Sequence, residues 1–249
     1  MTDRNYRTAL VTGASRGIGA AISRRLAAGG LTVYGVARSA EALTQLEREI
    51  GPAFIPVPGD VCDLPALLKA LPTSDIDVLV NNAGAIASVR PLTQQDAAET
   101  ARTVALNLTA PILLMQALLP GMIARGRGHV FNLTSTAARG VLPGTVTYSA
   151  CKAAITQAGH VLRYELAGTG VRLTDIAPAR VKTDIYLESF GRDKSGLEEK
   201  LFTGYRVLTP QDVADALWAA LSMPPHVDLS EIVITSTDQA AGGQRFEKG

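Results

Sequence analysis

Short apolar runs alternate with longer helix-patterned segments along all 249 residues, and this alternation limits the possible folds more than any other feature. Several runs are apolar throughout, as expected for strands of a parallel sheet that helices cover on both faces. Strands joined through helices connect by right-handed crossovers and build a doubly wound sheet. The pattern therefore predicts one α/β domain over residues 1–249, with a single Rossmann-type parallel sheet of about seven strands and helices on both faces.

The predicted strands are Thr8–Val11, Thr32–Ala37, Ala53–Val57, Val78–Val80, His129–Leu133, Val171–Ile176 and Ile232–Ile234. The predicted helices are Ile18–Ala28, Glu41–Ile50, Pro65–Ala70, Ala98–Ile123, Tyr148–Ala167 and Pro210–Ser222. One segment, Arg180–Arg206, breaks the rhythm because it is polar and mixed in charge. Long insertions in compact domains are often lids or binding loops, so we expect a lid there.

The composition excludes several classes of protein. The 24 basic residues nearly balance the 23 acidic ones, so no strong field attracts nucleic acid or an anionic membrane. The two cysteines, Cys62 and Cys151, form no CxxC motif, and the three histidines are dispersed, so we expect no disulfide framework and no metal site. There is no apolar leader at the start and no uninterrupted apolar run of roughly 18 residues, so we expect a cytoplasmic protein without a membrane span.

The stretch ALVTGASRGIGAAI, residues 9–22, reads as a strand, a glycine-rich turn and the start of a helix. Glycine lets such a turn approach a ligand without a Cβ clash, and the helix N-terminus offers free N–H groups to a pyrophosphate. An ordinary glycine-rich βα turn is the alternative, but the position after the first strand favours a dinucleotide site. The predicted cofactor contacts in this turn are Gly13, Ser15, Arg16, Gly17, Ile18 and Gly19.

The end of the second predicted strand distinguishes between the two nicotinamide dinucleotides. An acidic residue there binds the ribose 2′-hydroxyl of NAD(H), whereas an arginine accommodates the 2′-phosphate of NADP(H). The strand ends in YGVARS, with Ala37 in place of the acid and Arg38 after it. Arg16 adds a second guanidinium, and two guanidiniums suit a phosphate dianion. Both arginines could instead be solvated surface residues, but the missing acid favours NADP(H).

Two further stretches follow strands at the sheet edge where ligands bind. In GDV, Asp60 suits a bond from an adenine amino group and the Val61 N–H suits a ring nitrogen, although an Asp that caps the next helix is nearly as good an explanation. In VNNAG, the small residues allow close approach to a ribose, although they are also ordinary loop residues. We predict cofactor contacts from Asp60, Val61, Asn81, Ala83 and Gly84.

Tyr148 and Lys152 lie four residues apart in TYSACKAA, which places both on one face of a helix. The pair could form an acid–base site or stand at a solvated edge, and the spacing alone does not decide between them. A free phenol has a pKa of about 10, and a nearby ammonium favours the phenolate. We therefore predict that Lys152 lowers the pKa of Tyr148. Cys151, between them, fits a small buried packing residue.

Several motifs together resemble the short-chain dehydrogenase/reductases, and the resemblance covers nearly the whole chain. The motifs occur in the order and at the intervals typical of the family. They are TGASRGIG from Thr12, NNAG from Asn81, Asn107, Ser135, Tyr148-x-x-x-Lys152 and Pro178…Thr183.

The resemblance implies a role for each of four predicted catalytic residues. Tyr148 would be the general acid in carbonyl reduction and the base in alcohol oxidation, and Lys152 would also bind the nicotinamide ribose. Ser135 would bond the substrate oxygen and share its developing charge, with Thr134 as the rival. Asn107 would hold a water that links Lys152 to solvent; a helix-interior Asn with a local bond is the alternative.

The stretch IAPARVKTD resembles the family's loop beside the nicotinamide, which implies cofactor contacts from Pro178, Val181 and Thr183. The chain departs from the family's pattern at Ala179, where glycine is usual. If that position needs a positive φ, alanine strains the loop.

The C-terminal third resembles the branch that reduces malonic semialdehyde and oxidises serine-type 3-hydroxy acids, and it lacks the VDGG-like tail typical of 3-ketoacyl-carrier-protein reductases. Arg139 and Arg180 follow Ser135 and Pro178, and at the pocket mouth a guanidinium would pair with a substrate carboxylate. The alternative is that they face solvent or another subunit. We expect a small carbonyl or alcohol substrate, with a 3-oxo acid, 3-hydroxy acid or semialdehyde preferred.

Two other readings stay open. Reductases of specialised metabolism that act on aldehydes or ketones share these features, and some proteins of this fold are non-catalytic scaffolds. The four predicted catalytic residues are intact, which favours an enzyme. Helices Ala98–Ile123 and Tyr148–Ala167 carry apolar residues around much of their circumference, as helices buried on more than one side do. The resemblance implies that they pair in a four-helix interface, so we expect a homo-oligomer, a homotetramer in particular.

Overall fold

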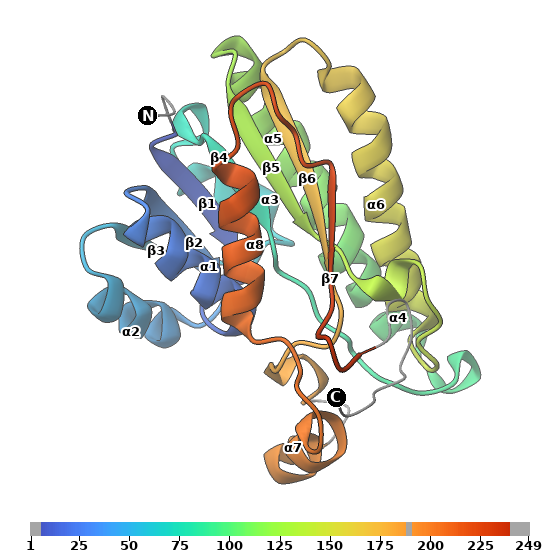
Figure 1. Cartoon of the computed structure of the whole chain (residues 1–249). Helices are drawn as coiled ribbons and strands as arrows, with labels where there is room; N and C mark the ends of the chain where they lie inside the picture. Colours follow the sequence, from blue (N-terminus) through green and yellow to red (C-terminus); the bar gives the residue numbers. More distant parts are fainter. Residues whose placement is uncertain (1–5, 188–190, 240–249) are drawn as a thin grey trace.

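The computed structural model describes residues 6–187 and 191–239, and its strands form one parallel sheet in the order β3-β2-β1-β4-β5-β6-β7 (Figure 1). Residues 188–190 of the predicted lid, and residues 1–5 and 240–249 of the predicted domain, lie outside the described residues. The strands are β1 (Thr8–Thr12), β2 (Thr32–Ala37), β3 (Phe54–Pro58), β4 (Val78–Asn81), β5 (Gly128–Leu133), β6 (Val171–Pro178) and β7 (Glu231–Ile234).

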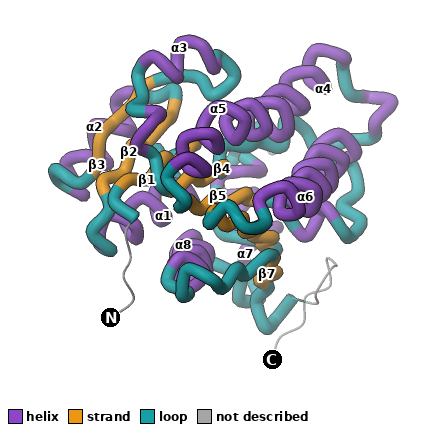
Figure 2. Tube along the Cα trace, turned by 90° about the horizontal axis from the view of Figure 1, so that it is seen from above, coloured by secondary structure: helices purple, strands orange, loops and turns teal. Residues whose placement is uncertain are grey.

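Helices cover both faces of this sheet (Figure 2). On one face lie α1 (Gly17–Ala28), α2 (Ala40–Ile50) and α8 (Pro210–Leu221), and on the other lie α3 (Leu64–Lys69), α5 (Ala110–Ala124) and α6 (Val146–Leu166). Consecutive residues of β1 alternate between the two cores, because Ala9 and Val11 belong to the first and Leu10 to the second. Both faces are therefore buried, which explains the uniformly apolar strands and confirms the predicted fold class.

The longest helical run is not a regular α-helix. It comprises α4 (Ala97–Val104), a π-helical turn η3 (Ala105–Thr109) and α5, where the sequence predicts one continuous helix. This run, Ala97–Ala124, is long and apolar enough to cross a membrane by length and composition. The sequence suggests no membrane span because it has no uninterrupted apolar run of that length. In Ala97–Ala124 the polar residues Asn107 and Gln116 interrupt the apolar ones. Leu114, Leu118 and Met122 are at most 1% exposed against the sheet, so we assign the run to the core.

The lid segment leaves the sheet after β6 and contains the 3₁₀ turn η5 (Asp184–Tyr186) and the helix α7 (Lys194–Phe202), which the sequence does not predict. In Figure 1, α7 protrudes beyond the carboxyl ends of the strands. A parallel bridge between Val181 and Leu208 closes its base, and Arg206 is bonded to Asp238 after β7. The remaining short turns are η1 (Thr73–Asp75), η2 (Leu92–Gln94) and η4 (Thr136–Ala138).

Candidate active site

The glycine-rich turn after β1 is locked to the loop after β4. Asn82 Nδ2 donates to the carbonyl of Thr12 at 2.8 Å, and the N–H groups of Asn82 and Ala83 each donate to Thr12 Oγ1 at 3.0 Å. Gly13 has a φ of +66°, and a Cβ on it would stand 2.9 Å from Asn82 Nδ2. Neither Thr12 nor Asn82 is among the predicted contacts, because the sequence NNAG does not indicate which asparagine faces the turn.

Asn81, which the sequence predicts as a cofactor contact, has its side chain in the core. Its Nδ2 donates to Asn132 Oδ1 at 3.0 Å, and Asn132 in turn donates to Asp175 Oδ1 at 3.0 Å. Arg163 pairs with the other oxygen of that carboxylate. The amide of Asn81 therefore joins a buried chain of polar groups across β4, β5 and β6, and the side chain does not reach the loop.

The start of α1 fits a bound phosphate. No side chain of the described residues caps this helix, which leaves its first N–H groups to a ligand or to water. Gly19 must lack a Cβ, because one would stand 2.1 Å from the carbonyl oxygen of Gly13. A Cβ on Gly17 would meet the Thr183 methyl at 3.4 Å, so the loop after β6 borders the same turn. Ser15 is half-buried in the turn, and Ile18 packs on the core.

The two predicted phosphate-binding arginines are solvent-exposed at this edge. Arg16 is 71% exposed, and its Nη1 lies 4.0 Å from Asp184 Oδ2 in the lid. Arg38 is exposed directly after β2, which ends in Ala37 as predicted. Arg38 and Asp60 both lie close enough to Cys62 for their charges to affect the pKa of its thiol, which burial raises.

The GDV stretch forms a local turn beside Arg38. Asp60 is exposed and accepts from the Cys62 N–H at 2.9 Å. It does not cap the next helix, because the N-cap of α3 is Asp63. Val61 is buried at 6% exposure.

Three of the four predicted catalytic side chains meet at Tyr148. Ser135 lies close enough to the Tyr148 phenol to lower its pKa, and its Oγ accepts from the Ala137 N–H at 3.1 Å. Lys152 Nζ lies 5.6 Å from the Tyr148 ring centroid and donates to the Leu133 carbonyl at 2.7 Å. Tyr148 and Lys152 are 7% and 6% exposed, so the pair does not stand at a solvated edge. The rival of Ser135, Thr134, donates to the carbonyl of Ile176 and is thereby committed to the sheet.

Asn107 lies in the π-helical turn, a feature that often marks functional sites. Its Nδ2 donates to the carbonyls of Thr103 and Ala85, both at 3.0 Å, so it makes the expected local bond and also reaches the loop after β4. Its Oδ1 is buried and has no partner within the described chain. A Cβ on Gly84 would stand 2.8 Å from this oxygen and 3.5 Å from Lys152 Nζ. Both polar groups therefore border one small space that glycine keeps open.

Burial governs the titration of the Tyr–Lys pair. It raises the pKa of the Tyr148 phenol well above its ordinary value, nearby Tyr186 adds to this, and Ser135 opposes it. Burial also lowers the pKa of Lys152 to about 8. The prediction that Lys152 lowers the pKa of Tyr148 is wrong for this structure, because the loss of solvation outweighs an amine that is bonded to the Leu133 carbonyl.

The surroundings of Tyr148 are apolar on one side. Tyr148 packs with Ile86 and Ala137, and with the partly buried Leu142, Ile185 and Tyr186. These residues come from the loop after β4, the segment after β5 and the lid. Sequence reasoning missed them because they share no motif and lie in stretches that look polar or irregular. The lid thus contributes two side chains to the wall beside the phenol.

The two predicted substrate arginines have different surroundings. Arg139 forms an ion pair with Glu231 on β7, so its guanidinium is engaged with a protein carboxylate, unlike the expectation. Arg180 is half-buried, and its Nη1 donates to Tyr205 Oη at 2.8 Å. It also lies close enough to Tyr186 to oppose the burial that raises the pKa of that phenol. Through Tyr186, Arg180 borders the Tyr148 site, whereas Arg139 points to the sheet edge.

The backbone at Ala179 and the two cysteine thiols also have defined surroundings. Among the described residues, Arg192 is the one non-glycine residue with a positive φ, so Ala179 causes no left-handed strain. The Ala179 N–H donates to the carbonyl of Ile234. Pro178 ends β6, and Val181 is 6% exposed in the core. Both cysteines are free thiols, with Cys62 exposed and Cys151 buried, as a packing residue would be.

The structure thus places a buried phenol beside a buried amine at the edge of a doubly wound sheet where ligands bind. Residues 7–193 match the sequence profile of the short chain dehydrogenase family. The chain belongs to the short-chain dehydrogenase/reductase family.

Two relatives and one solved structure illustrate the similarity. An uncharacterised short-chain type dehydrogenase/reductase of Sinorhizobium fredii is 34% identical over 98% of this chain and 96% of its own length. The NADP-dependent 3-hydroxy acid dehydrogenase YdfG of Salmonella typhi is 35% identical over 94% of this chain and 96% of its own. The closed form of a serine dehydrogenase complexed with NADP⁺ superposes with a TM-score of 0.89 at 33% identity, covering 97% and 100% of the two chains.

The lowered pKa of Lys152 predicts a pH-dependent stability. An unfolded lysine keeps its proton to about pH 10, so between about pH 8 and pH 10 the unfolded chain binds more protons than the folded one. Folded stability therefore rises with pH in this window. Relative to Lys152→Met, the wild type should gain roughly 2 kcal/mol between pH 7.5 and 9.5 in urea unfolding. Parallel stability curves for the two proteins would show that Lys152 titrates normally.

Proposed function

We propose that this protein is an NADP(H)-dependent oxidoreductase that interconverts a small carbonyl compound and its alcohol, with a 3-oxo acid or semialdehyde as the preferred carbonyl. The observation that carries the proposal is the burial of Tyr148 and Lys152 side by side, with Lys152 Nζ 5.6 Å from the Tyr148 ring centroid and Ser135 near the phenol. Two relatives support it by name, one an NADP-dependent 3-hydroxy acid dehydrogenase and one a serine dehydrogenase bound to NADP⁺.

NADPH would supply the hydride to the carbonyl carbon. The uncapped start of α1 and the close-approach glycines would hold its pyrophosphate, with Arg16 and Arg38 on the 2′-phosphate. Asp60 and Val61 would border the adenine, and Ala83 and Gly84 the ribose. Lys152 and Tyr148 would bind the nicotinamide ribose, and Pro178, Val181 and Thr183 would border the nicotinamide.

In reduction, Tyr148 would donate its proton to the carbonyl oxygen. Its raised pKa keeps the phenol protonated near neutral pH, which is the form that a general acid needs. Ser135, which lies near the phenol, would bond the same oxygen and share its developing charge. Lys152 and Asn107 border one space beside Gly84, and a water there would return a proton toward Tyr148.

The substrate proposal rests on Arg180. Its guanidinium lies beside Tyr186, which packs against Tyr148, so a carboxylate bound there would place its own carbonyl near the phenol. Arg139 is left out of the proposal because it pairs with Glu231. The apolar wall of Ile86, Leu142 and Ile185 favours a second candidate, an uncharged aldehyde or ketone.

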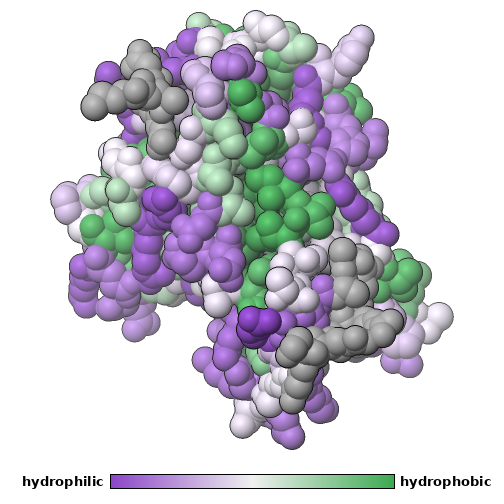
Figure 3. Space-filling model, viewed as in Figure 1, coloured by the Kyte–Doolittle hydropathy of each residue, from purple (hydrophilic) through white to green (hydrophobic). Residues whose placement is uncertain are grey.

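We also propose a homotetramer, because two separate surfaces are suited to self-association. The outer faces of α5 and α6 expose Ile112, Ile123, Val161 and Tyr164, the last at 88%. The second surface is the edge strand β7, where Figure 3 shows apolar surface and Val233 is 44% exposed. Two different isologous interfaces are what a tetramer of dihedral symmetry requires. Light scattering should report four chains, and a monomer at micromolar concentration would refute the assembly.

Tyr148→Phe tests the reaction itself. Removing the acid should lower kcat/KM for every reduced carbonyl by roughly 100-fold or more, since positioned proton transfer contributes about that much. NADPH oxidation is followed with a panel of small aldehydes, ketones and 3-oxo acids, and the melting temperature controls for folding. If the wild type is as inactive as the variant on the whole panel, a non-catalytic scaffold explains the protein better.

Arg38→Ala tests the choice of cofactor. Loss of a charge-assisted phosphate bond should raise KM for NADPH roughly 10-fold while KM for NADH, which has no 2′-phosphate, stays within error. Arg48→Ala, an exposed arginine on α2, is the matched control and should change neither value. An equal rise for both cofactors in Arg38→Ala would argue against the phosphate contact.

Arg180→Ala tests carboxylate recognition. KM for a 3-oxo acid should rise roughly 10-fold or more, whereas KM for an uncharged ketone of similar size should change little. Because Arg180 also bonds Tyr205, the lid could loosen, and loosening would affect both substrates alike. A similar rise for both substrates would therefore remove the carboxylate from the proposal and favour the uncharged candidate.

A further inference from the structure

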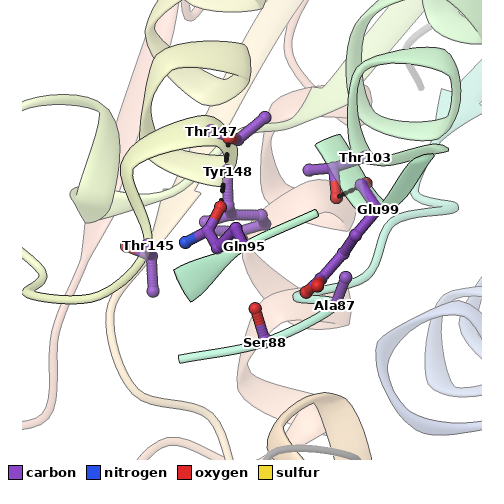
Figure 4. Close-up of a pocket in the computed structure, with 8 residues that line it drawn as sticks. All are labelled: Ala87, Ser88, Gln95, Glu99, Thr103, Thr145, Thr147 and Tyr148. Carbon is purple, nitrogen blue, oxygen red and sulfur yellow. Dashed lines mark hydrogen bonds between the residues drawn. The ribbon is translucent and has the colours of Figure 1, made fainter. Parts of the chain in front are cut away.

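A small polar cavity borders Tyr148 on the side of α4 (Figure 4). Its volume is about 10 Å³, which is room for a single water-sized group. It is distinct from the apolar wall, because its lining comes from the loop after β4, the first turns of α4 and the start of α6. The lining residues are Ala87, Ser88, Gln95, Glu99, Thr103, Thr145, Thr147 and Tyr148.

Glu99 is the unusual member of this lining, because it is a carboxylate whose side chain is only 8% exposed. Its Oε2 accepts from Arg90 Nη2 at 2.8 Å. Its Oε1 is buried and has no partner among the described residues. A buried carboxylate oxygen without a hydrogen bond costs free energy, so a donor that enters the cavity is favoured. In Figure 4 the carboxylate of Glu99 lies beside Ala87 and Ser88.

Ser88 adds a second unsatisfied group, since its buried Oγ also lacks a partner in the described part of the chain. The walls are held in place by backbone contacts. The Arg90 N–H donates to the Gly144 carbonyl at 3.0 Å, and Gln95 Nε2 donates to the Arg90 and Gly144 carbonyls at 2.9 and 3.3 Å. The loop before α4 and the loop before α6 are therefore tied together, and the cavity between them is preformed.

These two groups select the chemistry of the occupant. Oε1 of Glu99 needs a donor, and the Ser88 hydroxyl can donate or accept. The Arg90–Glu99 pair is neutral as a unit, so a neutral donor is accommodated without a net buried charge, whereas an ammonium would leave one. The volume excludes a carboxylate or a ring. A hydroxyl group is a hydrogen-bond donor, carries no charge and fits the volume.

We propose that this cavity is a hydroxyl subsite for the substrate, in which Glu99 and Ser88 bind a hydroxyl carried on a carbon near the reacting carbonyl. Tyr148, whose phenol would protonate the carbonyl oxygen, is itself one of the residues that line the cavity. The preferred substrates are therefore small hydroxylated carbonyl compounds and their diols. This inference rests on the proposed carbonyl-reductase function and deepens it. The rival occupant is a single structural water that the substrate never displaces.

Three ketones that differ in one group test the subsite, namely acetone, hydroxyacetone and aminoacetone, which carry a hydrogen, a hydroxyl and an ammonium. The wild type should show a kcat/KM for hydroxyacetone at least 10-fold above that for acetone. Glu99→Gln should lower this ratio roughly 10-fold. Arg90 needs an oxygen, so the amide turns its NH₂ into the cavity, and the charge-assisted bond from the substrate hydroxyl to the carboxylate is replaced by a weaker neutral one. Ser88→Ala should lower the ratio in the same direction.

Glu49→Gln is the matched control, because Glu49 also pairs with an arginine, Arg24, but lies exposed on α2 over the opposite face of the sheet. It should leave the ratio unchanged, and melting temperatures check that each variant folds. If Glu99→Gln does not fold, Ser88→Ala carries the test.

Four results would overturn the inference, and they differ from one another. An unchanged ratio in the folded variants means that the cavity holds only a water. A loss confined to aminoacetone means that the subsite binds a cation. If the wild type reduces other carbonyls but none of these three, the subsite is wrong; if it reduces no carbonyl at all, the proposed function fails with it.

Discussion

Parallel strand pairing is the constraint on which the rest of this structure depends. It places the ends of β1, β4, β5 and β6 at one edge, with Asn81 in register with Asn132 and Leu133 in register with Ile176. The four loops that follow these strands must therefore meet. Thr12 and Asn82 fix the first two of these loops to each other. The apolar residues of both cores hold the sheet, and the polar residues that follow its strands make the site.

The second feature of the site is its dryness. Tyr148 and Lys152 are almost fully buried. The loss of solvation raises the pKa of Tyr148 and lowers the pKa of Lys152, so it favours the neutral form of each side chain. A neutral phenol is a proton donor, which is the form that the proposed reduction requires. Lys152 is bonded to the carbonyl at the end of β5 and faces the space that it shares with Asn107. The same burial that tunes the pair leaves Asn107 Oδ1 and Glu99 Oε1 without partners in the described structure.

Much of the fold and part of the site could be predicted, and particular residues show where prediction ended. The glycines of the turn were predictable because a Cβ at Gly19 would collide with the backbone, a local effect. Ser135 and Thr134 are adjacent and chemically alike, and only strand pairing shows that Thr134 bonds Ile176. Asn81 and Asn82 are likewise adjacent and identical, and only the fold shows that Asn82 bonds the turn while Asn81 bonds Asn132. Glu99, Ser88 and Tyr186 gave no signal, because no periodicity or spacing relates them to Tyr148.

The sequence by itself determined the layers of a doubly wound sheet, because apolar periodicity acts over a few residues, and its motifs resembled those of the family. The tertiary structure decided which asparagine locks the turn and that Arg139 meets Glu231 while Arg180 meets the lid. It also decided that burial, not the neighbouring amine, sets the state of Tyr148. These outcomes depend on solvent exclusion and on contacts between segments far apart in the chain, which no local pattern encodes.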